Sequence, residues 1–268
     1  MYAIYGVLTL FGLMLRFILK LAYTDPLTGF YADLGFFPMA YTIVLAAGIL
    51  GMLVLNQLRG PGKDHALSGR GWLLPILAIL SGAALALYMW NGLPNPLEPL
   101  SPAINPRFAA ILRTVNVVLG YISAGGLIVT GIAGLSDRIP PGILLTVPPI
   151  WQIVLLLSRF NGYHSILHIA DYMLIILFMM FASLFYVGHG RIVSETGRKD
   201  GRNYIISTGL CTSACGFLLV IPNYIYMLFT FSPIPVSLFS IYESIYVLLL
   251  SSYALAFVVR YTKSLGQV

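Results

Sequence analysis

The sequence is poor in charged residues. Asp, Glu, Lys and Arg make up only 9% of its 268 residues, whereas soluble domains average about 25%. Apolar residues make up 59%, and the mean hydropathy is +0.89. A surface with so little charge would not be wetted by water, which excludes a soluble globular protein. The composition predicts an all-α integral membrane protein with several spans.

Other absences narrow the function further. The two cysteines, Cys211 and Cys215, lie within one apolar segment, so the sequence predicts no disulfide framework. The glycine-rich loops contain no GxxxxGK[ST] pattern, so a nucleotide site is not supported. The net charge of +6 comes from basic residues in short loops, as the cytoplasmic bias of membrane proteins predicts. We therefore expect no nucleic-acid partner.

Eight stretches are long and apolar enough to cross a bilayer, which needs about 20 such residues. The fifth contains Pro148 and Pro149, and because proline removes a backbone hydrogen bond, a kink or a broken helix is expected there. The predicted spans are residues 2–21, 36–58, 72–90, 108–133, 142–159, 165–188, 204–229 and 237–260.

The basic residues predict the orientation of these spans. Ten of the 15 follow the second, fourth, sixth and eighth spans, and the other five lie toward the opposite side. Because loops rich in Lys and Arg stay in the cytoplasm, the sequence predicts a multi-pass protein of the cell membrane with both termini cytoplasmic. The loop at 91–106, rich in proline and asparagine, then faces outward.

The sequence also predicts an internal duplication. Thr28-Gly29-Phe30-Tyr31 opens the second span, and Asn161-Gly162-Tyr163-His164 opens the sixth, 133 positions later. Residues 1–133 and 134–268 would then be two four-span halves of one membrane domain. An even number of spans in each half makes the halves parallel, so they would be related by a pseudo-twofold axis along the membrane normal.

Polar residues within the spans gather toward the predicted outer side. An ionisable residue in a span costs about 2.5–3.5 kcal/mol on insertion scales, so each requires a partner or a polar cavity. We expect a ligand pocket in the outer third of the bundle. The candidate ligand-binding residues are Arg16, Arg113, Asn116, His168, Asp171, Asn223 and Glu243.

Arg113 and Glu243 are the strongest candidates for a pair. When Pro106 is aligned with Pro235 in the predicted duplication, Arg113 falls beside Glu243, and the pseudo-twofold would bring the two toward one axis. Asn116 shares the helix face of Arg113. Such a pair is either a salt bridge that orders the two halves or part of an outward pocket for an anion or zwitterion, because a guanidinium matches a carboxylate or phosphate.

A metal site is the third possibility. His164, His168 and Asp171 are spaced to lie on one helix face, and Glu243 could add an oxygen. Zinc held there could activate water for hydrolysis. The simpler interpretation is a His–Asp hydrogen bond inside the bundle. We therefore expect no cofactor, with zinc as the alternative.

Three functions follow from these features. The first is a transporter or carrier of a small polar or anionic ligand. The second is a ligand-sensing or partner-binding membrane subunit, which would act through a cytoplasmic or membrane protein partner. The third is an intramembrane metal-dependent hydrolase. Binding or transport is favoured over enzymatic activity, and the lipid bilayer and a small-molecule ligand are the expected partners.

Overall fold

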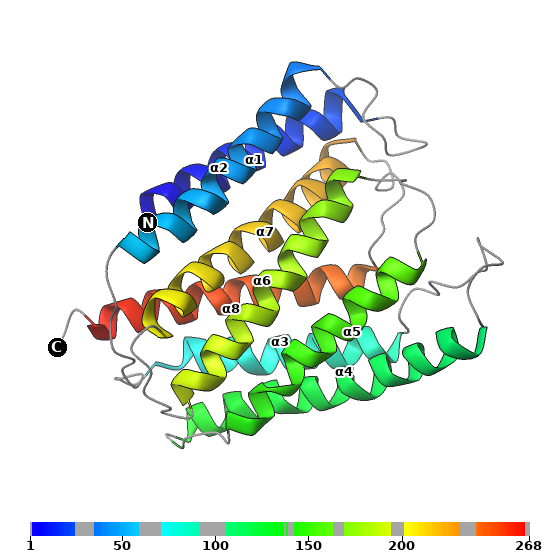
Figure 1. Cartoon of the computed structure of the whole chain (residues 1–268), viewed down its shortest axis with the longest axis vertical. Coiled ribbons are helices and arrows are strands. Elements are labelled where there is room, and N and C mark those ends of the chain that lie inside the picture. Colours follow the sequence, from blue (N-terminus) through cyan, green and yellow to red (C-terminus); the bar gives the residue numbers. More distant parts are fainter. Residues whose placement is uncertain are drawn as a thin grey trace.

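The protein is a bundle of long helices (Figure 1), seen in a computed structural model that describes residues 2–24, 35–58, 71–91, 106–136, 138, 142–162, 169–193, 201–230 and 240–265. Eight helices in these ranges are long and apolar enough to cross a membrane. The α-helices are α1 (Tyr2–Ala22), α2 (Phe36–Leu58), α3 (Leu73–Trp90), α4 (Pro106–Leu135), α5 (Val147–Gly162), α6 (Ile169–Val193), α7 (Gly201–Thr230) and α8 (Ile241–Leu265). The predicted eight-span helical architecture is confirmed.

The fifth span is broken where its prolines predict a break. A 3-10 helix, η1 (Gly142–Leu145), precedes α5, and Pro148 and Pro149 occupy the first turn of α5. Backbone N–H groups in a first helical turn have no partner within the helix, so proline is tolerated there. The prolines therefore set the start of α5 instead of kinking its interior.

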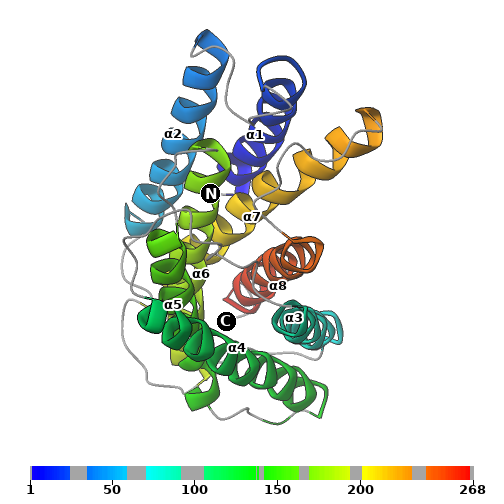
Figure 2. The same cartoon turned by 90° about the vertical axis from the view of Figure 1, so that its right-hand side faces the viewer.

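Six helices form a ring. Neighbouring pairs pack in the order α3, α4, α5, α6, α7, α8, and α8 closes the ring by packing on α3. Figure 2 shows these six helices from a second side, with α3 and α8 seen nearly end-on. Helices α1 and α2 lie outside it as a pair against α7. In this order α5 stands opposite α8, so a contact between these two helices crosses the ring interior.

Helix α7 is the most enclosed element, with 83% of its most apolar stretch buried. Its middle is rich in small residues, Thr208 through Gly216, which let the neighbouring helices approach closely. Cys211 and Cys215 lie in this stretch as buried free thiols. The hydroxyls of Thr208 and Thr212 donate to backbone carbonyls four residues earlier, so their polarity is satisfied within the helix.

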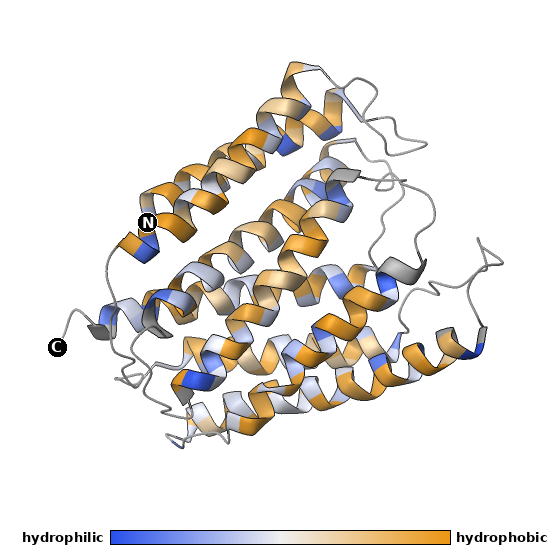
Figure 3. Cartoon of the chain, in the orientation of Figure 1, coloured by the Kyte–Doolittle hydropathy of each residue, from blue (hydrophilic) through white to orange (hydrophobic). Residues whose placement is uncertain are grey.

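The outer surface of the bundle is apolar. Figure 3 shows hydrophobic residues along every helix, with hydrophilic residues mainly toward the helix ends. Large apolar side chains such as Leu10, Ile43, Leu87 and Ile122 are exposed. A surface of this kind is stable in lipid and not in water, which fits the class of multi-pass membrane protein.

The described contacts do not show the predicted duplication. Helices α1 and α2 both pack on α7, whereas their counterparts in the second half, α5 and α6, have no comparable packing on α3 within the described ranges. The halves 1–133 and 134–268, and the pseudo-twofold axis between them, therefore stay predictions from sequence.

Glycines allow α3 and α4 to pack backbone against backbone. A Cβ at Gly82 would lie 2.7 Å from the carbonyl oxygen of Ala124, and one at Gly131 would lie 2.6 Å from that of Pro75. A backbone carbonyl oxygen, unlike the end of a side chain, cannot make room for the added Cβ by changing rotamer. The space around Gly125, on the outer side of the same helix as Gly131, is open.

Gly131→Ala should therefore destabilise the protein, while Gly125→Ala should not. Overpacking of this kind costs about 1–3 kcal/mol, which would appear as a lower midpoint of thermal unfolding in detergent. Gly125→Ala is the matched control, because it makes the same change on the same helix. Equal midpoints for the two variants would contradict this account of α3–α4 packing.

Candidate functional site in the ring interior

A buried ion pair crosses the ring. The Arg159 guanidinium of α5 bonds the Glu243 carboxylate of α8, through Nη2 and Oε1. Glu243 is only 3% exposed and Arg159 is also buried. Tyr88 of α3 lies beside both charged groups. Three helices of the ring thus meet at one pair of opposite charges, well away from water.

The local sequence explains why each charge sits where it does. Ser240 caps α8, since its Oγ accepts a hydrogen bond from the backbone N–H of Glu243 at 3.1 Å. Glu243 therefore lies in the first turn of α8, and Arg159 lies in the last turn of α5. The positive end of one helix dipole faces the carboxylate and the negative end of the other faces the guanidinium, which stabilises both charges.

A second polar contact crosses the ring one helical turn along α8 from the ion pair. Gln152 of α5 donates from Nε2 to the Tyr246 hydroxyl of α8 at 3.1 Å. The Trp151 ring packs edge-on against the Tyr246 ring, with 5.7 Å between centroids. Tyr246 is one turn beyond Glu243 on α8, so both contacts use the same helix face.

Asn116 adds an unpaired amide to this interior. Its side chain is 0% exposed, and neither its Nδ2 nor its Oδ1 has a hydrogen-bond partner among the described residues. It lies one turn before Gly120, where a Cβ would meet Met89 and would come within 3.2 Å of Trp151 Nε1. Helix periodicity therefore places Asn116 on the face of α4 that packs toward α3 and α5.

Other buried polar atoms on the ring helices share this property. Trp151 Nε1, Gln152 Oε1 and Glu243 Oε2 have no hydrogen-bond partner in the described part of the chain. We call the set of residues that lines this interior the ring site. It comprises Tyr88, Asn116, Trp151, Gln152, Arg159, Glu243 and Tyr246.

The opposite end of the ring interior is filled by aromatic rings. His189 of α6 is sandwiched by Phe185, stacked at 5.8 Å, and Phe257, edge-on at 4.5 Å. Its Nε2 lies 3.2 Å from the Tyr253 hydroxyl. All four side chains are buried. This aromatic plug separates the ring site from the predicted cytoplasmic side.

A second buried ion cluster joins α1 to the ring. Asp171, in the first turn of α6, bonds the Arg16 guanidinium and lies 3.1 Å from the Lys20 Nζ. The Arg16 guanidinium carbon also lies 5.4 Å from the centre of the Tyr41 ring, a cation–π distance. Arg16, Lys20 and Asp171 join the last turns of α1 to the first turn of α6.

The structure divides the predicted ligand-binding residues among different places. Glu243 pairs with Arg159 in the ring site and Asn116 is buried on the face of α4 that packs toward α3 and α5, whereas Arg16 and Asp171 belong to the α1 cluster. Arg113 is exposed on α4. The Arg113–Glu243 pair is therefore not formed, because Glu243 faces Arg159 across the ring. Asn223 is buried in α7, where it donates to the carbonyl of Leu219 at 2.9 Å.

The metal candidates are described only in part. His164 and His168 lie outside the described residues, whereas Asp171 is engaged by two cations. Within the described ranges, no three His, Cys, Asp or Glu side chains group as metal ligands would. A zinc site stays a prediction from residue spacing.

Glu243 lies less deep in its span than predicted. The predicted eighth span begins at residue 237, whereas α8 begins at Ile241 after the non-helical Ser240. The residues just before Ile169, where the predicted sixth span begins, lie outside the described part of the chain. The Ser-x-x-Glu pattern at Ser240 is typical of a helix start. It would have predicted the start of α8 correctly.

Arg159 was missed as a site residue, because it was counted only among the basic residues of the predicted outer side. The sequence also missed Gln152, Tyr246, Tyr88 and Trp151, since uncharged polar and aromatic residues in a span are common.

Comparison of the chain with protein-family models, with curated proteins and with solved structures found no match. The fold and the ring site define a class, a multi-pass helical membrane protein with a buried polar interior.

Removing Arg159 should destabilise the protein strongly. Arg159→Ala would leave the Glu243 carboxylate buried without its cation, which costs about 3–5 kcal/mol. Glu243→Gln should cost less in the Arg159→Ala background than alone, because the two residues share one interaction. Unfolding in denaturant, followed by circular dichroism, measures these differences.

Arg113→Ala provides the control for this cycle. Arg113 is an exposed arginine, and substitutions at exposed positions usually change stability by about 0.5 kcal/mol or less. Additive effects of Arg159→Ala and Glu243→Gln would show that the two side chains do not interact.

Proposed function

We propose that the protein is a carrier that binds a small polar ligand in the ring site and moves it across the membrane. The observation that carries this proposal is Asn116, a fully buried amide with no partner for either polar atom among the described residues. An unsatisfied buried polar group costs about 1–3 kcal/mol. A group retained at that cost, within a cluster of similar groups, is typical of a binding site.

The ring site favours a ligand with both donors and acceptors. Trp151 Nε1 and Asn116 Nδ2 are donors available to a ligand, and Gln152 Oε1, Asn116 Oδ1 and Glu243 Oε2 are acceptors. The Arg159–Glu243 pair has no net charge. A simple anion would satisfy only the donors and would be repelled by Glu243. A zwitterion or a neutral polar molecule, such as an amino acid or a polyol, would satisfy both kinds of group.

The arrangement of the ring supports transport over simple binding. The ring site lies toward the predicted outer side, and the aromatic plug of Phe185, His189, Tyr253 and Phe257 lies between it and the predicted inner side. A carrier needs a site that is closed to each side in turn. The plug is built from side chains whose rotation would open the inner path without unfolding a helix.

Replacing Asn116 should separate function from stability. Asn116→Leu keeps the approximate side-chain size and removes the unsatisfied amide, so the free energy of unfolding should stay unchanged or rise by about 1–3 kcal/mol. Stabilisation of the wild-type protein by a ligand should disappear in this variant. The assay is thermal unfolding in detergent with a panel of amino acids, polyols and small carboxylates.

Asn56→Leu is the control for this substitution. Asn56 is also a buried asparagine, but it lies on α2 outside the ring and bonds the backbone carbonyl of Asn203. This variant should lose stability and keep ligand-dependent stabilisation. The proposal fails if Asn116→Leu destabilises the protein as Asn56→Leu does and leaves stabilisation by the ligand intact.

Flux distinguishes a carrier from a sensor. A compound that stabilises the wild-type protein should enter proteoliposomes that contain it, and Asn116→Leu should abolish this entry. Binding of the same compound without entry would identify the protein as a ligand-sensing subunit.

We also propose that the protein lies in the cell membrane with both termini in the cytoplasm. The support is the distribution of basic residues, ten of 15 on one side. Asn91 after α3 and Ser136 after α4 are exposed and lie at opposite ends of the bundle. In a background with Cys211→Ala and Cys215→Ala, Asn91→Cys should react with an impermeant maleimide on intact cells, and Ser136→Cys should react only after lysis. The reverse pattern would invert the orientation.

A further inference from the structure

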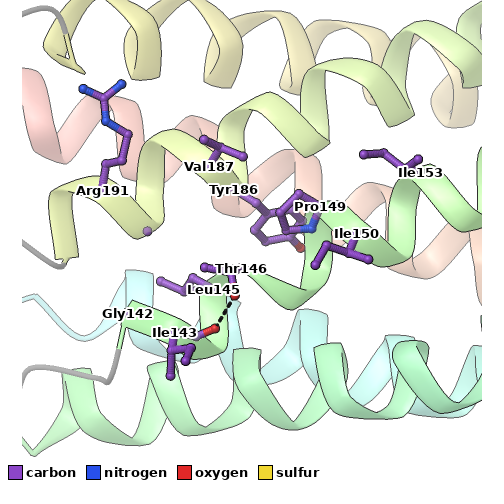
Figure 4. Close-up of a pocket in the computed structure, with 11 residues that line it drawn as sticks. Gly142, Ile143, Leu145, Thr146, Pro149, Ile150, Ile153, Tyr186, Val187 and Arg191 are labelled. Atoms are coloured by element: carbon purple, nitrogen blue, oxygen red, sulfur yellow. Dashed lines mark hydrogen bonds between the residues drawn. The ribbon is translucent and has the colours of Figure 1, made fainter.

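A crevice opens on the outer surface of the ring, between η1, α5 and α6. It has a volume of about 570 Å³ and runs from η1 along the first turns of α5 (Figure 4). Its walls include Ile143, Ile150, Ile153 and Val187, which are 75%, 51%, 52% and 44% exposed. These residues lie within two of the eight membrane-length apolar segments. The crevice therefore opens toward the hydrocarbon core of the bilayer.

The broken fifth span creates this crevice. The 3-10 helix η1 and the α-helix α5 are separate helices joined at Thr146. They therefore do not form one continuous helix packed against α6. Gly190 brings α6 close to η1, where a Cβ would lie 3.5 Å from that of Leu145. The Tyr186 ring forms the inner wall, and the same side chain lies beside Tyr246 of the ring site. The crevice and the ring site are thus separated by one tyrosine.

One end of the crevice is charged. Arg191, in the last turn of α6, lines it together with Gly142. Val187 and Arg191 are one helical turn apart, so the apolar wall leads directly to the guanidinium (Figure 4). The basic segment 194–203 follows α6 in the sequence. The charged end of the crevice therefore lies on the predicted cytoplasmic side.

We propose that this crevice binds an anionic phospholipid of the cytoplasmic leaflet, with its phosphate at Arg191 and an acyl chain along Ile143, Ile150, Ile153 and Val187. The volume is within the range of small-molecule sites. The opening lies in hydrocarbon, where acyl chains are the molecules that fill apolar grooves. The guanidinium selects a phosphate-bearing headgroup, as basic pockets at the cytoplasmic ends of spans do. This site is independent of the carrier function proposed for the ring site.

Lipid retention in native mass spectrometry tests the proposal. Protein purified from nanodiscs of equal parts phosphatidylglycerol and phosphatidylcholine should retain one phosphatidylglycerol in preference to phosphatidylcholine. Arg191→Gln should weaken this preference about fivefold, the effect of one basic residue at a membrane surface. Arg138→Gln is the matched control, because Arg138 is an exposed arginine on the same predicted side that does not line the crevice.

A second variant tests the acyl-chain part of the site without touching the charge. Val187→Trp would fill the crevice and should reduce retention of both lipids, and because Val187 is exposed the variant should fold. Equal retention of the two lipids by the wild-type protein, or unchanged preference in Arg191→Gln, would overturn the headgroup assignment. Unchanged retention in Val187→Trp would overturn the assignment of the crevice. None of these results depends on a ligand in the ring site.

Discussion

The Arg159–Glu243 pair constrains the whole ring. A charge inside a bundle surrounded by lipid needs a partner, because leaving it alone costs about 3–5 kcal/mol, a large share of the stability of a typical domain. This pair links α5 and α8, which stand opposite one another and do not neighbour each other in the ring. The four other ring helices must therefore pack around a polar interior of fixed width. Ser240 and the two helix dipoles hold the charges at the ends of their helices.

A similar arrangement of charges joins α1, which lies outside the ring, to the ring helix α6. In the α1 cluster, cations near the carboxyl end of α1 meet a carboxylate in the first turn of α6. Both clusters thus place an acid at a helix start and a base at a helix end, on the same predicted side of the membrane. The α1 cluster pairs its carboxylate with two cations, whereas the Asn116 amide and the Trp151 indole of the ring site have no hydrogen-bond partner among the described residues. That difference is why the ring site, and not the α1 cluster, is the proposed binding site.

Hydropathy predicted the spans closely, and local capping explains the boundary at α8 that it missed. Pro148 and Pro149 indicated the break before α5, because proline acts through its own backbone. The start of α8 was placed four residues early, since hydropathy does not detect a cap such as Ser240. Of the candidate site, Glu243 and Asn116 could be identified as polar residues in spans. Tyr246 and Gln152 could not, because nothing in their sequence distinguishes them from other polar residues in spans.

The amino-acid sequence is enough to predict a multi-pass membrane protein, its eight spans and where most of them begin and end. These are properties of single segments, set by length and by the cost of placing charge in hydrocarbon. The pairing of Glu243 with Arg159, which leaves Arg113 exposed, is visible only in the folded bundle. The same holds for the position of α5 opposite α8 and for the crevice between α5 and α6. Each of these depends on which helix faces meet, and distant residues set that through packing.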